Sequence, residues 1–421
     1  MRPPRGKFSS DLIWNAGAFG LSALIGVLLN VLILRTHGAS ALGVFNQAYA
    51  LYILLSQLAV GGVHLAVQAF VPRDLQAERR PDVQLTVALV LGTVTALVVM
   101  AFAWLLRDLP GRWSDSSGVG DAFPLVIPGL LFFTWNKVLL SYHNGARRMR
   151  LFAVFQLLRF VLMLVALAVL VALKRPAHEL AALLTLAEAG LLLVLLPATL
   201  PHWRPLRVTG ARQVAREQFR FGNRALAGNF LLDVNTRVDV FLLGFFLDDR
   251  AVGHYSMGAT VAEGVMYLPV LFRNTINPVI PRAWHQGGAM LLGKVVRRNR
   301  RSFFRLLAPL IALTIPVLPA GMWMLGMREE PLTVWAVYTI LVAGVALTAG
   351  HQPFLMLFSQ VGRPGTQTLF IAGIFAANVL LNLALIPVLG LLGSALATAL
   401  SNGALVLLMD HLARTRLQIR P

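Results

Sequence analysis

The sequence contains no cysteine and little charge for its length. Of its 421 residues, 13% are charged and 57% are hydrophobic. The lack of cysteine excludes disulfides, thiolate metal sites and cysteine nucleophiles. A soluble domain needs roughly a quarter of its residues to be charged in order to cover its surface with polar groups. The shortage of charge therefore excludes a soluble globular protein of this size.

The apolar residues occur in blocks of about 20, the length at which a helix crosses the roughly 30 Å hydrocarbon core of a bilayer. The sequence predicts an all-α polytopic membrane protein of about 12 transmembrane helices. The first block is too long for the apolar core of a signal peptide and lacks a small-residue cleavage site, so we expect it to be a span. The predicted spans are 12–34, 43–71, 83–106, 123–143, 151–173, 180–200, 225–247, 255–281, 303–326, 332–360, 368–388 and 391–409.

The net charge is +19, and most of the 37 Lys and Arg residues lie in alternate connections between these spans. Two such connections hold the basic runs at 147–150 and 297–301. Lys and Arg gather on the cytoplasmic side of inner-membrane proteins, so both termini are predicted to lie in the cytoplasm. These segments are also suited to attract membrane lipids with anionic head groups. No nucleic-acid partner is expected, because the basic runs lack interleaved aromatic residues.

A basic connection divides the chain into two halves. We predict an N-lobe over residues 1–203 with the first six spans, a basic cytoplasmic linker over 204–224, and a C-lobe over 225–421 with the other six. An internal repeat matches this division, since Ala41–Phe45 and Ala251–Tyr255 read alike and open spans 2 and 8. Parallel repeats of this kind are typical of transporters, in which the substrate path runs between the halves.

Spans 2 and 8 each carry a stripe of polar residues on one helical face, counted at 100° per residue. The stripes consist of Asn46, Gln57, His64 and Gln68 on span 2, and of Glu263, Tyr267, Asn274 and Asn277 on span 8. Two interpretations stay open. Such residues form hydrogen bonds between packed helices, or they line a water-filled path through the membrane.

Span 7 carries the most charge at membrane depth. Asn229, Asp233 and Arg237 follow one another at i, i+4 and i+8, and Asp239 lies on the opposite face. Span 8 adds Arg273. The Asp233–Arg237 pair could simply offset its own burial, or it could line a cavity. Asp239 could be a packing residue, and Arg273 is close enough to the inner end of its span to snorkel toward water.

Several segments have the pattern of a known superfamily. Asp239–Gly244 is followed by Val252-Gly253-His254-Tyr255, and Leu381–Pro387 runs into Gly390–Thr398. These segments resemble the multidrug, oligosaccharidyl-lipid and polysaccharide exporters, and most of all the bacterial oligosaccharide-lipid flippases of polysaccharide biosynthesis. The resemblance implies two six-helix lobes that form a V around a central cavity, which spans 1, 2, 7 and 8 line.

The resemblance also implies the function. It indicates a flippase that moves a lipid-diphosphate-linked oligosaccharide across the inner membrane by alternating access, for cell-surface polysaccharide assembly. Arg237 and Arg273 are the candidate diphosphate ligands, because arginine forms forked hydrogen bonds with phosphate oxygens. Asn229 and the polar stripes are the candidate sugar contacts. Asp233, Glu263 and Asp239 are the candidate coupling carboxylates, and the coupling ion, H⁺ or Na⁺, stays open.

Other functions stay open as well. A cation-coupled multidrug exporter of the same superfamily would need acidic and aromatic groups, and fewer arginines, around its cargo. A membrane-embedded glycan polymerase or glycosyltransferase would need a large outer loop, whereas the longest outer loop here is only 107–122. We therefore expect no enzyme activity, no cofactor and no metal site. The expected partners are the lipid-linked oligosaccharide and membrane lipids, and polysaccharide polymerase machinery is an open addition.

Overall fold

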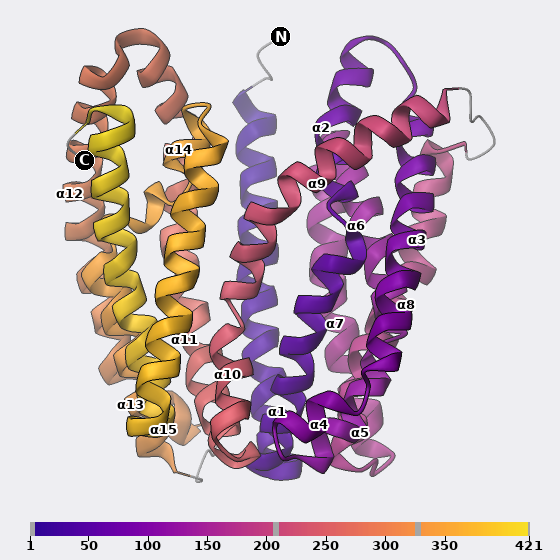
Figure 1. Ribbon diagram of the computed structural model, residues 1–421, viewed down its shortest axis with the longest axis vertical. Coiled ribbons are helices and arrows are strands. Elements are labelled where there is room, and N and C mark those ends of the chain that lie inside the picture. The colour runs from indigo at the N-terminus through magenta and orange to yellow at the C-terminus, as the bar shows by residue number, and fades with distance from the viewer. Residues whose placement is uncertain (1–4, 205–209, 325–329, 420–421) are drawn as a thin grey trace. The chain divides into compact units, whose positions relative to one another are not determined.

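The computed structural model describes residues 5–204, 210–324 and 330–419, and the regular secondary structure within these ranges is entirely helical (Figure 1). This confirms the predicted all-α membrane fold. The α-helices are α1 (Arg5–Val60), α2 (Val63–Gln76), α3 (Asp82–Leu105), α4 (Leu109–Trp113), α5 (Ser117–Val126), α6 (Gly129–Gly145), α7 (Met149–Ala172), α8 (Ala182–Thr199), α9 (Ala211–Asn235), α10 (Val238–Phe246), α11 (Asp249–Ile276), α12 (Val279–Met324), α13 (Pro331–Thr348), α14 (Leu357–Gln360) and α15 (Pro364–Leu417). Short 3₁₀ helices are η1 (Ala177–Ala181), η2 (Leu200–His202) and η3 (Gln352–Phe354).

Seven helices within the described residues are long and apolar enough to cross a membrane, or eight if α5 and α6, which meet at a 47° bend, form one span. Three of them far exceed one crossing. One of them, α15, has 54 residues, which at about 1.5 Å per residue would give a rod of roughly 80 Å. A bilayer core is only roughly 30 Å thick, so a helix of this length must contain more than one crossing.

Glycines interrupt these three long helices. Gly38 in α1 has φ 84°, Gly288 in α12 has φ 55°, and Gly390 in α15 has φ 59°. These angles lie in the region that glycine alone enters without steric cost. Each glycine falls in or beside a connection that the sequence predicts between two spans, so each long helix consists of two arms joined at a tight corner.

The chain forms two compact units. Unit 1 contains residues up to His37 together with Val44–Val234, and unit 2 contains Gly38–Gly43 together with Asn235–Pro421. The division falls where α9 ends at Asn235 and α10 begins at Val238, inside the segment 225–247 that was predicted as one continuous span. Residues 225–234 thus group with unit 1, although the sequence placed them at the start of the second lobe.

Each unit has a central helix. In unit 1, α6 packs against α2, α3 and α8, and in unit 2, α13 packs against α11, α12 and α15. Tyr255, Tyr338, Phe358 and Phe370 are fully buried inside unit 2. The lipid-facing sides of the same helices keep large apolar residues exposed, for example Leu105 on α3 and Leu407 on α15, as expected for a surface that contacts hydrocarbon rather than water.

The internal repeat has a structural role within unit 2. A Cβ atom on Gly43 would collide with the carbonyl oxygen of Asp249, and one on Gly253 would collide with the carbonyl oxygen of Ala39. Gly43 and Gly253 occupy the same position in the two copies of the repeat. The repeated glycine is therefore needed because each copy packs closely against the backbone of the other.

Candidate binding and coupling groups

The polar stripe of unit 1 is largely buried, and it is split between two helices. Asn46 and Gln57 lie on α1, and His64 and Gln68 lie on α2, beyond a break at Gly61 and Gly62. The Nδ2 atom of Asn46 donates a hydrogen bond of 2.9 Å to the Oδ1 atom of Asn30. Gln57 and His64 are also buried, whereas Gln68 is exposed. The stripe is therefore not one continuous face.

A lysine lies close to this stripe. Lys137 of α6 is near enough to both His64 and Asp233 for electrostatic interaction, and its Nζ atom lies 5.8 Å from the centre of the Phe133 ring. Lys137 lies six residues from the end of the predicted span 123–143, a spacing that by itself indicates snorkelling toward the membrane surface. Its position on a packed helix, and not its spacing, brings it into range of the carboxylate of α9.

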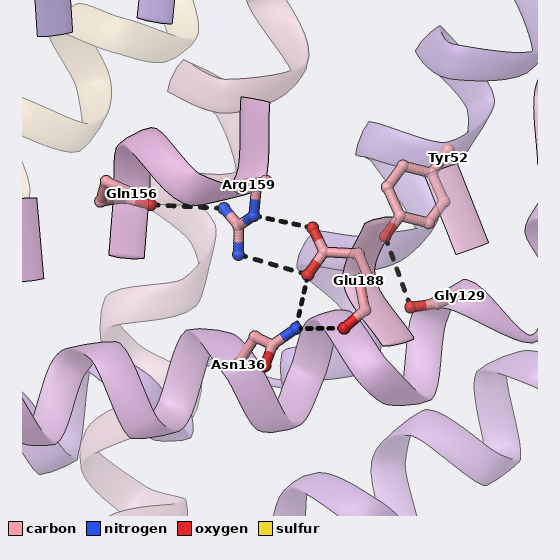
Figure 2. A network of polar contacts seen from close by, with 6 residues as sticks. All are labelled: Tyr52, Gly129, Asn136, Gln156, Arg159 and Glu188. Atoms are coloured by element: carbon pink, nitrogen blue, oxygen red, sulfur yellow. Dashed lines mark hydrogen bonds and ion pairs between the residues drawn. The ribbon is translucent and has the colours of Figure 1, made fainter. Parts of the chain in front are cut away.

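Unit 1 also contains a buried ion pair, which Figure 2 shows. The Nε atom of Arg159 lies 2.8 Å from the Oε1 atom of Glu188. Asn136 donates hydrogen bonds of 2.8 Å to the backbone oxygen and to the Oε2 atom of Glu188. The Arg159 guanidinium lies 5.2 Å from the centre of the Phe133 ring. This network ties α6, α7 and α8 together and leaves the carboxylate neutralised by a cation.

Unit 2 holds a second ion pair, and this one contains two of the predicted site residues. The Nη1 and Nη2 atoms of Arg237 lie 3.0 and 3.1 Å from the two carboxylate oxygens of Glu263. The prediction placed Arg237 in the middle of a helix, one turn after Asp233. In the structure, Thr236 and Arg237 form the break between α9 and α10, so the expected regular spacing does not extend to Arg237.

A second arginine, Arg273, lies on the same helix as the polar stripe of span 8, and its surroundings differ from those of Arg237. Arg273 of α11 is half-buried, and among the described residues no carboxylate pairs with it. Tyr267 and Asn274 are exposed on the same helix. Asn277 follows the helix end, and its Oδ1 atom is buried without a hydrogen-bond partner in the described structure.

Asp239 is buried in unit 2, and the groups that donate hydrogen bonds to it are uncharged. Its Oδ2 atom accepts a hydrogen bond of 2.5 Å from the Tyr255 hydroxyl, and its Oδ1 atom accepts one of 2.8 Å from the backbone N–H of Val240. Arg237 attracts it through space. The Tyr255 hydroxyl is also within hydrogen-bonding reach of Ser394.

The polar chain continues from Ser394 along α15. Ser394 donates a 2.7 Å hydrogen bond to the Oδ1 atom of Asn382, and Asn382 donates one of 2.9 Å to the Oδ1 atom of Asn378. Asn378 in turn donates one of 3.2 Å to the Oδ1 atom of Asn235. The sequence analysis did not predict this series of hydrogen-bonded side chains as part of a site. Asn382 and Ser394 are nevertheless part of the motifs that carry the family resemblance.

The side chain of Asn229 lies outside the described residues. Among the described residues, no cluster of three or more His, Asp or Glu side chains is arranged to hold a metal ion. The polar chain around Asp239 contains one carboxylate and several neutral oxygens, a donor set that can hold a proton or a hard monovalent cation.

The fold matches solved membrane transporters. It is similar to an inward-facing multidrug resistance MATE family transporter of the MOP superfamily, with a TM-score of 0.74 and 13% identity over 94% of both chains. It is also similar to the lipid II flippase MurJ in an inward closed conformation, with a TM-score of 0.73 and 14% identity over 96% of this chain and 88% of that chain. The fold is also similar to a MOP superfamily transporter from Pyrococcus furiosus, with a TM-score of 0.66 and 13% identity over 98% of this chain and 95% of that chain.

A comparison of the sequence with protein-family models identifies the family. No curated protein matches this chain. The family model for polysaccharide biosynthesis proteins, however, matches residues 9–284, well over half of the sequence. That match and the shared fold confirm the resemblance found in the motifs, and the chain belongs to the polysaccharide biosynthesis protein family.

Proposed function

We propose that this protein is a flippase that moves a lipid-diphosphate-linked oligosaccharide across the inner membrane by alternating access, for cell-surface polysaccharide assembly. The family supports a role in polysaccharide biosynthesis. The fold supports transport, since the similar structures are transporters and one of them is a lipid flippase. The distribution of Lys and Arg supports an inner-membrane location with both termini in the cytoplasm.

Arg273 carries the proposal for an anionic cargo. A charged group at membrane depth costs at least about 2.5–3.5 kcal/mol on insertion scales, and Arg273 has no carboxylate among the described residues to offset this cost. A phosphate in the cargo would supply the missing charge through forked hydrogen bonds. A site for cationic drugs would disfavour such an arginine, so this observation ranks the flippase above the multidrug exporter.

Arg237 contributes a second, switchable cation. When the site is empty, both nitrogens of its fork are held by Glu263. A diphosphate competes for the same guanidinium and releases the Glu263 carboxylate, which must then find a proton, another cation or water. Cargo binding thereby changes the charge balance of α11, and Arg237 and Glu263 act together as a binding and coupling pair.

Asp239 is the leading coupling group, with Asp233 as a second candidate in unit 1. A buried carboxylate surrounded by neutral donors is stable when it carries a proton or binds a cation. Exchange of that ion would shift the polar chain of Tyr255, Ser394 and Asn382 between two hydrogen-bonding states. An ion gradient of H⁺ or Na⁺ could drive transport in this way.

The glycan of the cargo would contact the polar stripes. Tyr267 and Asn274 are exposed, and the buried Oδ1 atom of Asn277 has no hydrogen-bond partner among the described residues. Asn46 already bonds to Asn30, and Gln57 and His64 are buried. We assign the main sugar contacts to unit 2, and a supporting role to the stripe of unit 1.

The test is glycan export by cells that depend on this protein. Arg273→Ala should abolish export while the protein still inserts, and Arg273→Lys should retain part of it, since it keeps the charge and loses the fork. Arg282→Ala, at an exposed arginine just beyond α11, is the matched control and should export normally. Normal glycan export by Arg273→Ala would contradict the proposal. Efflux of a cationic drug by the purified protein would favour the multidrug exporter instead.

A further inference from the structure

A groove lies in unit 2, between the two arms of α15. The arms, residues 364–389 and 391–417, fold back on each other at Gly390 and lie side by side (Figure 1). The groove has a volume of about 600 Å³. Its apolar walls are Leu369, Gly373, Leu408 and Leu412, and its polar rim is His411, Thr415 and Arg416.

The apolar and polar parts are separated along the groove. Thr415 and Arg416 belong to the last helical turn of α15, and all three rim residues are exposed. Gly373 and Leu408 lie deeper along the two arms, toward the membrane interior. A groove with hydrocarbon walls and a basic rim at the membrane surface has the polarity of a phospholipid, with acyl chains inside and a head group at the edge.

The rim carries positive charge that the described residues do not neutralise. Arg416 has no carboxylate partner in the described structure, whereas its neighbour Arg414 lies 4.0 Å from Asp410. The backbone oxygen of Arg416 accepts a hydrogen bond from the Arg363 guanidinium, which brings a second cation to the same rim. This charge favours an anionic head group over a zwitterionic one, because basic clusters next to membrane spans attract anionic lipids.

The depth of the groove depends on a residue without a side chain. A Cβ atom on Gly373 would lie 2.8 Å from the Cδ1 atom of Leu408. Any larger side chain at position 373 would therefore push into the space between the arms. The glycine keeps the apolar part open, and a substitution there can fill it without touching the charged rim.

We propose that this groove binds one anionic phospholipid, with its acyl chains between Leu369 and Leu408 and its phosphate held by Arg416 and Thr415. The site is independent of the proposed transport function, since it lies on α15 alone and none of its residues is a proposed cargo ligand. It would anchor the last two arms of unit 2 to the bilayer surface.

Native mass spectrometry of the purified full-length protein tests this. The protein is mixed with phosphatidylglycerol or phosphatidylethanolamine of identical acyl chains, and retained lipid is counted. We expect one preferentially retained phosphatidylglycerol, with about fivefold weaker retention in Arg416→Ala, the loss expected for one arginine near a membrane surface. Arg414→Ala is the matched control, because Arg414 is exposed and lies outside the groove. It should behave as the wild type.

A second variant separates the apolar part from the rim. Gly373→Leu should reduce the retention of both lipids, because it occupies the space of the chains. If that variant fails to fold, Leu369→Gln serves the same purpose at an exposed position. Equal retention of the two lipids by the wild type would overturn the proposal. So would equal losses in Arg416→Ala and Arg414→Ala, or displacement by soluble glycerol phosphate at the lipid's own concentration, which would indicate a site for free phosphate.

Discussion

Each unit buries a carboxylate, but the two carboxylates have different partners. In unit 1, Glu188 faces the guanidinium of Arg159 at 2.8 Å and is held further by Asn136. In unit 2, Asp239 is held by the Tyr255 hydroxyl and a backbone N–H, and its connections continue into a chain of asparagines and serine. The first carboxylate has a fixed countercharge in direct contact, and the second does not.

This difference separates a structural group from an exchangeable one. A buried ion pair is complete without any outside ion, so Glu188 has little reason to exchange a proton or cation. A buried carboxylate held by neutral donors needs a proton or a cation to offset its burial, and it can exchange that ion when the path opens. If the protein is the proposed ion-coupled flippase, the comparison favours Asp239 of unit 2 as a coupling group and a structural role for the Arg159–Glu188 pair of unit 1.

The largest expected effect is on transport by Asp239→Asn. The amide cannot exchange a proton or replace the negative charge, but it keeps the size of the side chain. Its oxygen can accept the hydrogen bond of the Val240 N–H, and its NH₂ group can donate one to the Tyr255 hydroxyl oxygen. We expect export to be abolished while the thermal unfolding temperature stays near that of the wild type. Glycan export measured beside thermal unfolding of the same preparation checks this, and full activity of Asp239→Asn would remove it from coupling.

The reverse pattern is expected for Glu188→Gln. This change leaves the Arg159 guanidinium buried without its countercharge, which costs about 3–5 kcal/mol. We expect a lower unfolding temperature and less protein in the membrane, with normal transport per folded molecule. Replacing Arg159 and Glu188 together by leucine should recover most of the stability. If the double variant is stable and cannot transport, the ion pair has a role beyond architecture.

A smaller effect on stability is expected where the two copies of the repeat meet. Gly253→Ala forces a methyl group against the backbone oxygen of Ala39, and overpacking of this kind costs about 1–3 kcal/mol. Gly264→Ala, on the same helix and with open space around it, is the control and should be neutral or slightly stabilising. Equal unfolding temperatures for the two variants would show that the corner relaxes freely.

The sequence predicts the fold of this protein well. Hydrophobic blocks, the asymmetry of Lys and Arg, and the repeat at Gly43 and Gly253 are local or periodic signals, and membrane helices amplify them because their backbone must bond to itself. The sequence misses the breaks that fall inside predicted spans. Residues 233–239 contain no proline or glycine, so the sequence there does not indicate that α9 ends at Asn235.

The candidate site was harder to predict for a related reason. Helical spacing can place residues on one face, but it cannot say which side chain of another helix they meet. It placed Arg237 near Asp233, while the partner that the structure gives it, Glu263, is 26 residues away on α11. Lys137 and Asn378 were missed in the same way. Their neighbours, Asp233 and Asn235, come from distant parts of the chain.

The smallest effect, and the last prediction, concerns the two polar stripes. Periodicity makes them equivalent, yet Gln57 is buried at 6% exposure, while Asn274 is exposed. Because the chain contains no cysteine, single cysteines can report on each position. A cysteine at Asn274 should react with a water-soluble thiol reagent in membranes, and one at Gln57 should react far more slowly. A lipid-facing control at Leu407 should stay inert, because the reagent does not enter hydrocarbon.

Equal reactivity at Gln57 and Asn274 would mean that both stripes face water, and the sugar contacts would then extend to unit 1. If Asn274 is as inert as Leu407, its face contacts lipid, and Arg273 beside it would have to be reassigned as a snorkelling residue.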